Sequence, residues 1–121
     1  MKTQVFLHSF AQRAPHREAL ACDGTRITYG EFDRRSNQLA AVLHDRGVRA
    51  GDRVILRLSN GLAWPLLCVA TMKLGAMVVP VSTRLTAPEV AFLEGDAEPR
   101  LNIADDDVAA LEADAAGASD A

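Results

Sequence analysis

The sequence lacks the short motifs that mark nucleotide sites and hydrolytic centres. Neither G-x-G-x-x-G nor G-x-x-x-x-G-K-[ST] occurs, so both common glycine-rich phosphate loops are missing. There is no G-x-S-x-G elbow, and the cysteines and histidines do not have metal-ligand spacing. Lysine is scarce, since the chain contains only Lys2 and Lys73, and Lys73 lies inside an apolar stretch. The sequence therefore predicts no catalytic residue, no cofactor-binding residue and no metal ligand.

Cysteine and long apolar runs are also scarce. Cys22 and Cys68 are far apart and each has apolar neighbours, which favours two reduced packing residues over a disulfide. No apolar run reaches the roughly 18 residues that a membrane-spanning helix needs. The first ten residues, MKTQVFLHSF, have no long apolar core and no small-residue cleavage site, which argues against a secretory signal. The expected location is the cytoplasm, without a membrane span.

The net charge of −3 hides an asymmetry along the chain. Residues 1–83 contain eleven basic and six acidic side chains, whereas residues 84–121 contain two basic and ten acidic ones. An acidic end of this kind is repelled by phosphate backbones, so we expect no nucleic-acid partner. The basic side chains of the first part are scattered, which favours an ordinary solvated surface.

Three consecutive aspartates, Asp105 to Asp107, invite a metal-site interpretation. A magnesium or calcium ion needs ligands that converge from several directions, and consecutive residues rarely supply them. Acidic side chains also favour the positive end of a helix dipole. The start of a helix, or a solvated tail, is therefore the preferred interpretation.

The stretch Arg53–Pro80, RVILRLSNGLAWPLLCVATMKLGAMVVP, predicts a strand, a helix and a second strand. Val54 to Leu58 form an apolar, β-branched run that suits a buried strand. Ser59 or Asn60 is expected to cap a helix over Gly61–Leu74, which is apolar almost all round and ends at Gly75. Ala76–Val81 returns as a strand. Such a unit predicts a right-handed crossover with parallel strands.

Before this unit, the sequence predicts a short helix over Val5–Ala14 that carries His8 on a solvent-facing or edge position. Two short strands, Glu18–Cys22 and Thr25–Thr28, flank Asp23-Gly24, a strong hairpin turn. Thr28 and Glu31 have the spacing of a capping box and open a helix that runs to about Arg46.

After the central unit, Thr86 and Glu89 form a second capping box, whose helix, Ala87–Glu94, should end at Gly95. A third strand is expected over Arg100–Ala104. We divide the chain into residues 1–104, an N-terminal subdomain, and residues 105–121, an acidic, alanine-rich tail with one possible short helix. The last stretch, ADAAGASDA, has nothing to bury and should be disordered. The expected fold class is α/β, a small doubly wound sheet with parallel strands flanked by helices, plus the N-terminal helix and hairpin.

Four segments, in order, resemble one known family. They are ITYGEFDRRSNQLAAVL at Ile27–Leu43, RGVRAGDRVIL, NGLAWPLLCVATMKLGAMVVPV and RLTAPEVAFLEGDAEPRL. Their order and spacing over about residues 5–104 resemble the N-terminal part of the adenylate-forming superfamily, which includes acyl-CoA synthetases and peptide-synthetase adenylation domains. Val81–Thr86, VSTRLT, is closer to the acyl-CoA synthetase type, although Ser82-Thr83 departs from the asparagine common there.

The resemblance implies a parent reaction that joins a carboxylate to AMP and passes the acyl group to a thiol. ATP, magnesium and coenzyme A are thus implied for a full-length relative. The family's Ser/Thr/Gly-rich phosphate loop, its later nucleotide motifs and the lysine of its C-terminal domain match no residue of this sequence. No functional position can be carried over, so the resemblance leaves open whether the chain is an enzyme.

Three hypotheses follow. The first is a truncated N-terminal scaffold of an acyl-CoA synthetase-like enzyme, inactive alone. The second is a stand-alone association module that pairs with a separate remainder chain or with itself, because a short parallel sheet has open edges. The third is an unrelated small α/β domain with a ligand outside the carboxyl ends of the strands.

Overall fold

The computed structural model describes residues 8–9, 11–22, 24–59 and 61–117. Residues 8–9 and 11–13 are helical, and the rest of the predicted N-terminal helix lies outside the described residues. The further elements, in chain order, are β1 Glu18–Cys22, β2 Thr25–Thr28, α2 Tyr29–Asp45, β3 Arg53–Arg57, α3 Ala63–Lys73, β4 Met77–Pro80, α4 Ala87–Ala97, β5 Leu101–Ala104 and α5 Asp105–Ala116.

A three-stranded parallel sheet with the order β4-β3-β5 forms the centre of the molecule. Val54 on β3 pairs with Val78 on β4 and with Leu101 on β5. The apolar run on β3 suits this place because the middle strand is covered on both faces, and Val54, Ile55 and Leu56 are fully buried. The parallel pairing of β3 with β4 and the predicted fold class are confirmed, and the right hand of the crossover stays a prediction.

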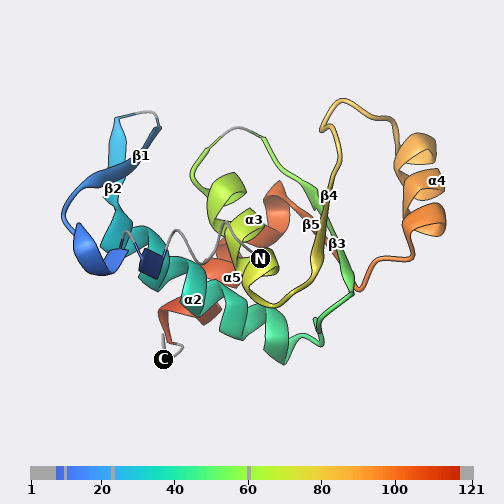
Figure 1. The fold of residues 1–121 in the computed structure, drawn as a ribbon. Helices are drawn as coiled ribbons and strands as arrows, with labels where there is room; N and C mark the ends of the chain where they lie inside the picture. The colour runs from blue at the N-terminus through green and yellow to red at the C-terminus, as the bar shows by residue number, and fades with distance from the viewer. Residues whose placement is uncertain (1–7, 10, 23, 60, 118–121) are drawn as a thin grey trace.

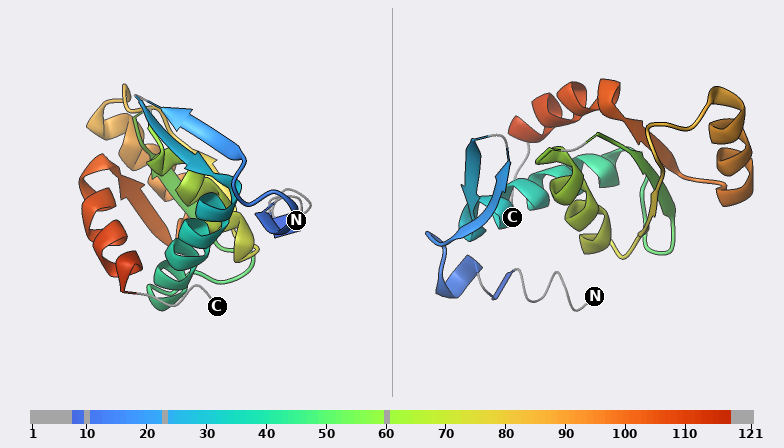
Figure 2. Two further views of the ribbon diagram at one scale, coloured as in Figure 1. Left: turned by 90° about the vertical axis from the view of Figure 1, so that its left-hand side faces the viewer. Right: turned by 90° about the horizontal axis from the view of Figure 1, so that it is seen from above.

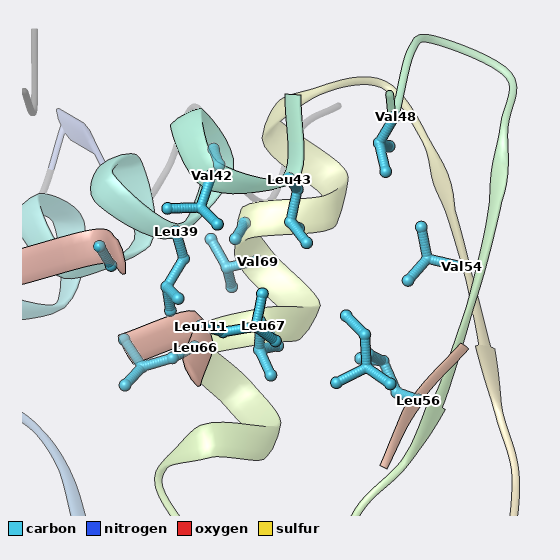
Figure 3. Close-up of a cluster of buried hydrophobic side chains, with 14 of the residues drawn as sticks. Leu39, Val42, Leu43, Val48, Val54, Leu56, Leu66, Leu67, Val69 and Leu111 are labelled. Atoms are coloured by element: carbon cyan, nitrogen blue, oxygen red, sulfur yellow. The ribbon is translucent and has the colours of Figure 1, made fainter. Parts of the chain in front are cut away.

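Helices α2, α3 and α5 cover one face of this sheet, and α4 stands on the other side (Figures 1 and 2). The main core fills the space between β3 and the three helices. Figure 3 shows Val54 and Leu56 of β3 facing this core. Its large buried members on the helices are Leu39, Val42 and Leu43 of α2, Leu66, Leu67 and Val69 of α3, and Leu111 of α5.

The predicted hairpin is confirmed. β1 and β2 pair in antiparallel orientation and form a separate two-stranded sheet beside the start of α2 (Figure 1). Gly24 has a φ of +81°, the positive value that the tight turn requires and that glycine adopts without strain. Asp23 lies outside the described residues.

Threonine hydroxyls cap α2 and α4 as the sequence predicts. Thr28 Oγ1 accepts a hydrogen bond from the Glu31 N–H at 3.1 Å. At α4 both bonds of the capping box form, since Thr86 Oγ1 accepts from the Glu89 N–H and Glu89 Oε1 accepts from the Thr86 N–H. These bonds satisfy amide groups that the first turn of a helix leaves free.

The predicted start of α3 is wrong. The helix begins at Ala63 rather than Gly61, and its N-cap is Leu62, which makes no side-chain capping bond. Gly61 has a φ of +152°, so the chain is still turning away from β3 at that point. The Ser59 backbone N–H donates to Asp105 Oδ1 at 3.0 Å, and Asn60 lies outside the described residues.

The predicted end of α4 is also wrong. The helix continues through Gly95 to Ala97, and the left-handed cap is Glu98, with a φ of 48°. Gly95 keeps a helical backbone, and the helix stops because Pro99 cannot continue it.

The expectation that residues 113–121 have nothing to bury is wrong for Ala115. α5 runs to Ala116, and Leu111 and Ala115, four residues apart, are buried against the core. Arg46 at the end of α2 forms an ion pair with Asp114 at 2.7 Å. The aspartates do begin this helix, as predicted, and residues 118–121 lie outside the described residues.

Candidate functional site

A pocket lies at the carboxyl edge of the parallel sheet, where ligands of α/β sheets commonly bind. The ends of β3 and β4 and the first turn of α3 meet there around a volume of about 250 Å³. We call it the edge pocket; its lining residues are Leu56, Leu58, Ser59, Trp64, Pro80, Val81 and Ser82. This is the site that the third hypothesis requires.

The edge pocket has few groups that could take part in catalysis. None of its lining side chains is titratable, so no lining residue can act as a general acid or base near neutral pH. Ser82 Oγ accepts a hydrogen bond from the Arg84 N–H at 3.1 Å. Trp64 on α3 is only half-buried, because it also forms a wall of the pocket.

A second arrangement joins α3 to α2 through Lys73. Its Nζ donates to Asp33 Oδ1, Ser36 Oγ and Asn37 Oδ1, each at 2.7 Å, and lies 3.1 Å from the Asp33 carbonyl oxygen. The Lys73 and Asp33 side chains are 12% and 13% exposed, so this is a largely buried ion pair. His8 Nδ1 lies 3.2 Å from Asp33 Oδ2 and completes what we call the Lys73 cluster.

The cluster has the properties of a structural clamp. Burial raises the pKa of Asp33, but hydrogen bonds and positive charge from Lys73 and His8 outweigh it and hold that pKa below its ordinary value. An ammonium group has three protons, and Lys73 directs its donors at acceptors from α2. A lysine held in this way has no free donor for a phosphate, so the geometry favours clamping the two helices over catalysis.

The remaining polar residues of interest have local roles. Asp105 accepts from the Ser59 N–H, and Asp107 Oδ2 accepts from the Ala104 N–H at 2.9 Å. Among the described residues there is no group of three or more histidine, cysteine and acidic side chains that could hold a metal ion. Cys22 and Cys68 are not joined by a disulfide. Burial raises the pKa of the Cys68 thiol, which disfavours the reactive thiolate.

Sequence reasoning missed the Lys73 cluster. The spacing of three polar residues, Asp33, Ser36 and Asn37, places them on one face of α2. This spacing could have indicated a polar contact on that face. Their partner on α3 was not visible, because the two helices meet only in the folded chain.

A family comparison now identifies the chain. The model of the family described as "AMP-binding enzyme" matches residues 7–120. The chain belongs to this family. The AMP-binding match confirms the resemblance drawn from the four sequence segments.

Curated relatives of this chain include two fatty-acid ligases. It is 40% identical over 78 residues to "Long-chain-fatty-acid--CoA ligase FadD13" of Mycobacterium tuberculosis, which is 64% of this chain and 16% of that ligase. It is 35% identical over 108 residues to "Fatty acid--[acyl-carrier-protein] ligase ScoC" of Streptomyces coeruleorubidus, which is 88% of this chain and 21% of that ligase. The chain thus spans about a fifth or less of these relatives' length.

A solved structure has the same fold. The N-terminal domain of FACL13 from Mycobacterium tuberculosis, crystallised with an inhibitor, superposes with a TM-score of 0.85 at 27% identity. The match covers 98% of this chain and 36% of that domain. In the part of the chain that the structure describes, no helix is both long and apolar enough to cross a membrane.

Proposed function

We propose that this chain is the N-terminal scaffold portion of a ligase of the acyl-CoA synthetase type and is inactive by itself. The parent reaction is the formation of an acyl-adenylate from a carboxylate and ATP, followed by transfer of the acyl group to a thiol. Fatty acids are the proposed carboxylates, because the relatives FadD13 and ScoC are named as fatty-acid ligases. The cytoplasmic location stays a prediction.

The main support is the match of nearly the whole chain to the AMP-binding family combined with its small share of each relative. The edge pocket has no titratable lining residue, and Lys73 is engaged with α2. The described residues do not fit a magnesium ion, since they bring no group of three suitable ligands together. We therefore assign ATP, magnesium and coenzyme A to other parts of a full-length ligase.

The test is carboxylate-dependent exchange of pyrophosphate into ATP by the purified 121-residue chain, over fatty acids of several lengths. Full-length FadD13 serves as the positive control, and a mock purification controls for contaminating ligases. We expect exchange at the level of the mock sample. Exchange that requires the fatty acid and rises in proportion to the chain's concentration would overturn the proposal.

One observation favours the association module as a second candidate. Phe92 on α4 is 73% exposed and lines an apolar groove with Leu85, Pro88 and Leu93, and exposed apolar patches often mark interaction sites. Pairing with a remainder chain is compatible with inactivity of the isolated chain, so the two candidates do not exclude each other.

A further inference from the structure

Residues 8–9 and 11–14, which we call the N-terminal segment, lie beside the first half of α2 (Figures 1 and 2). Backbone hydrogen bonds fix the chain just after this segment to the start of α2. The Gly30 N–H donates to the Pro15 carbonyl oxygen at 3.0 Å, and the Tyr29 N–H donates to the Arg17 carbonyl oxygen at 2.9 Å. This end of the segment is therefore held at any pH near neutrality, because backbone amides do not titrate there.

The other end of the segment is attached through a side chain that does titrate. His8 Nδ1 lies 3.2 Å from Asp33 Oδ2, and the two side chains are 60% and 13% exposed. A histidine ring changes its charge near neutral pH. The charged ring carries a proton on both nitrogens and donates to the carboxylate, whereas one tautomer of the neutral ring presents a lone pair to it. The contact is therefore stronger at mildly acidic pH.

The other charged groups at this contact keep their charge in the same pH range. Lys73 of α3 binds Asp33 Oδ1 at 2.7 Å, the oxygen that His8 does not use. Burial raises the pKa of Asp33, but the bonds from Lys73 and His8 outweigh it, so the carboxyl group stays ionised above about pH 4. Arg13 on the segment itself is permanently charged. Among these groups, His8 is the one that titrates between about pH 5 and 8.

The N-terminal segment has little else to hold its free end. Its helical residues are too few to form a stable helix alone in water. Ala11, at 8% exposed, is the one described residue of the segment that is buried, and its apolar side chain is a single methyl group. The contact of His8 with Asp33 therefore supplies a substantial share of the docking of this end.

We propose that His8 is a pH-sensitive latch, which holds the N-terminal segment on α2 when its ring is protonated and loosens it when the ring is neutral. Loosening exposes Ala11 and uncovers the Asp33 side of the Lys73 cluster, while the chain stays fixed at Pro15 and Arg17. This conformational device is independent of the proposed part in a ligase reaction.

The test is hydrogen exchange of the backbone amides of residues 11–13, detected by NMR in the whole 121-residue chain at about pH 6 and about pH 8.5. Division of the intrinsic rate at each pH by the measured rate gives a protection factor, which reports how often the segment opens. We expect protection factors about threefold lower at the higher pH, because a largely exposed ion pair stabilises weakly. The Gly30 amide, bonded at the fixed end, should keep its protection.

Two substitutions at His8 separate its charge from its size. His8→Gln, which is neutral at both pH values, should lower the protection at the lower pH to the level that the unaltered chain has at the higher pH. His8→Arg, which is charged at both, should keep the higher protection throughout. The matched control is His16→Gln, at an exposed position beyond the segment, which should preserve the pH dependence. Exchange of the Leu43 amide in the core checks that each variant is folded.

Three outcomes would overturn the inference. They are equal protection of residues 11–13 at the two pH values in the unaltered chain, a pH dependence that survives in His8→Gln, and a pH dependence that is lost in His16→Gln. None of these outcomes concerns pyrophosphate exchange by the isolated chain. Failure of the latch is therefore distinguishable from failure of the proposed function.

Discussion

Lys73 Nζ and Asp33 Oδ1 lie 2.7 Å apart and join the last turn of α3 to the first half of α2. Both side chains are largely buried, and Ser36 and Asn37 satisfy the other donors of the ammonium group. A buried charge that keeps all its partners is tolerated, whereas one that loses its partner is strongly destabilising. The pair therefore makes the packing of α2 against α3 sensitive to single substitutions.

Lys73→Met should lower the free energy of unfolding by about 3 kcal/mol, because it leaves the Asp33 carboxylate buried without its main partner. Denaturant unfolding followed by circular dichroism measures this change. Arg34→Met, which removes a positive charge from an exposed position of α2, is the control and should have a much smaller effect. Equal effects of the two substitutions would show that the cluster does not clamp the helices.

Stability should depend on pH through Asp33. The pKa of this carboxyl is lowered in the folded chain, so its contribution is present above the unfolded-state pKa of about 3.9 and is lost as the pH falls through the folded-state value. We expect the free energy of unfolding to fall below about pH 4. Asp33→Asn should remove this part of the dependence. Asp45→Asn, at an exposed position of the same helix, should preserve it.

Removal of the hydroxyl group should affect global stability at Thr28 but not at Thr86. Thr28→Ala should lower the free energy of global unfolding by about 1 kcal/mol, because α2 forms part of the main core. Thr86→Ala should leave global unfolding nearly unchanged and instead speed amide hydrogen exchange within α4, which has a single buried residue. Thr28→Ser and Thr86→Ser keep the hydroxyl and serve as controls. A global loss from Thr86→Ala would mean that α4 unfolds with the core.

Leu111→Ala tests whether α5 is part of the cooperative fold. Leu111 is 1% exposed, so its truncation should lower the free energy of unfolding by about 3 kcal/mol. Glu112→Ala, at the adjacent exposed position, should be close to neutral. If Leu111→Ala were also neutral, α5 would not contribute to the stability of the core. The measurement is denaturant unfolding of the whole chain.

Several elements were predictable because their causes are local. The apolar run of β3 predicts a strand that is buried on both faces. Gly24 predicts the hairpin, because glycine adopts the positive φ that the turn requires. Thr28 and Thr86 mark helix starts because a hydroxyl three residues before an amide can accept its hydrogen bond. The starts of α2 and α4 could be predicted in this way and that of α5 from its acidic first turn, whereas that of α3 could not.

The predictions that were wrong concern helix boundaries and burial that depend on residues distant in the chain or on two competing helix-stop residues. The N-cap of α3 is Leu62, and the Ser59 backbone N–H binds Asp105, a residue 46 positions away. Gly95 was predicted to end α4, but the helix continues to Ala97 and ends before Pro99. Ala115 looked unremarkable in an alanine-rich stretch and is buried because α5 folds back against the core.

The sequence by itself determined the order of strands and helices, the crossover and the family, because each depends on residues close together in the chain. Only the tertiary structure decided that Lys73 pairs with α2 and that Ser59 and Trp64 line a pocket without a titratable side chain. It also left Met77 of β4 and Phe92 of α4 exposed. These relationships join segments far apart in the sequence, and no local pattern encodes which helix meets which strand face.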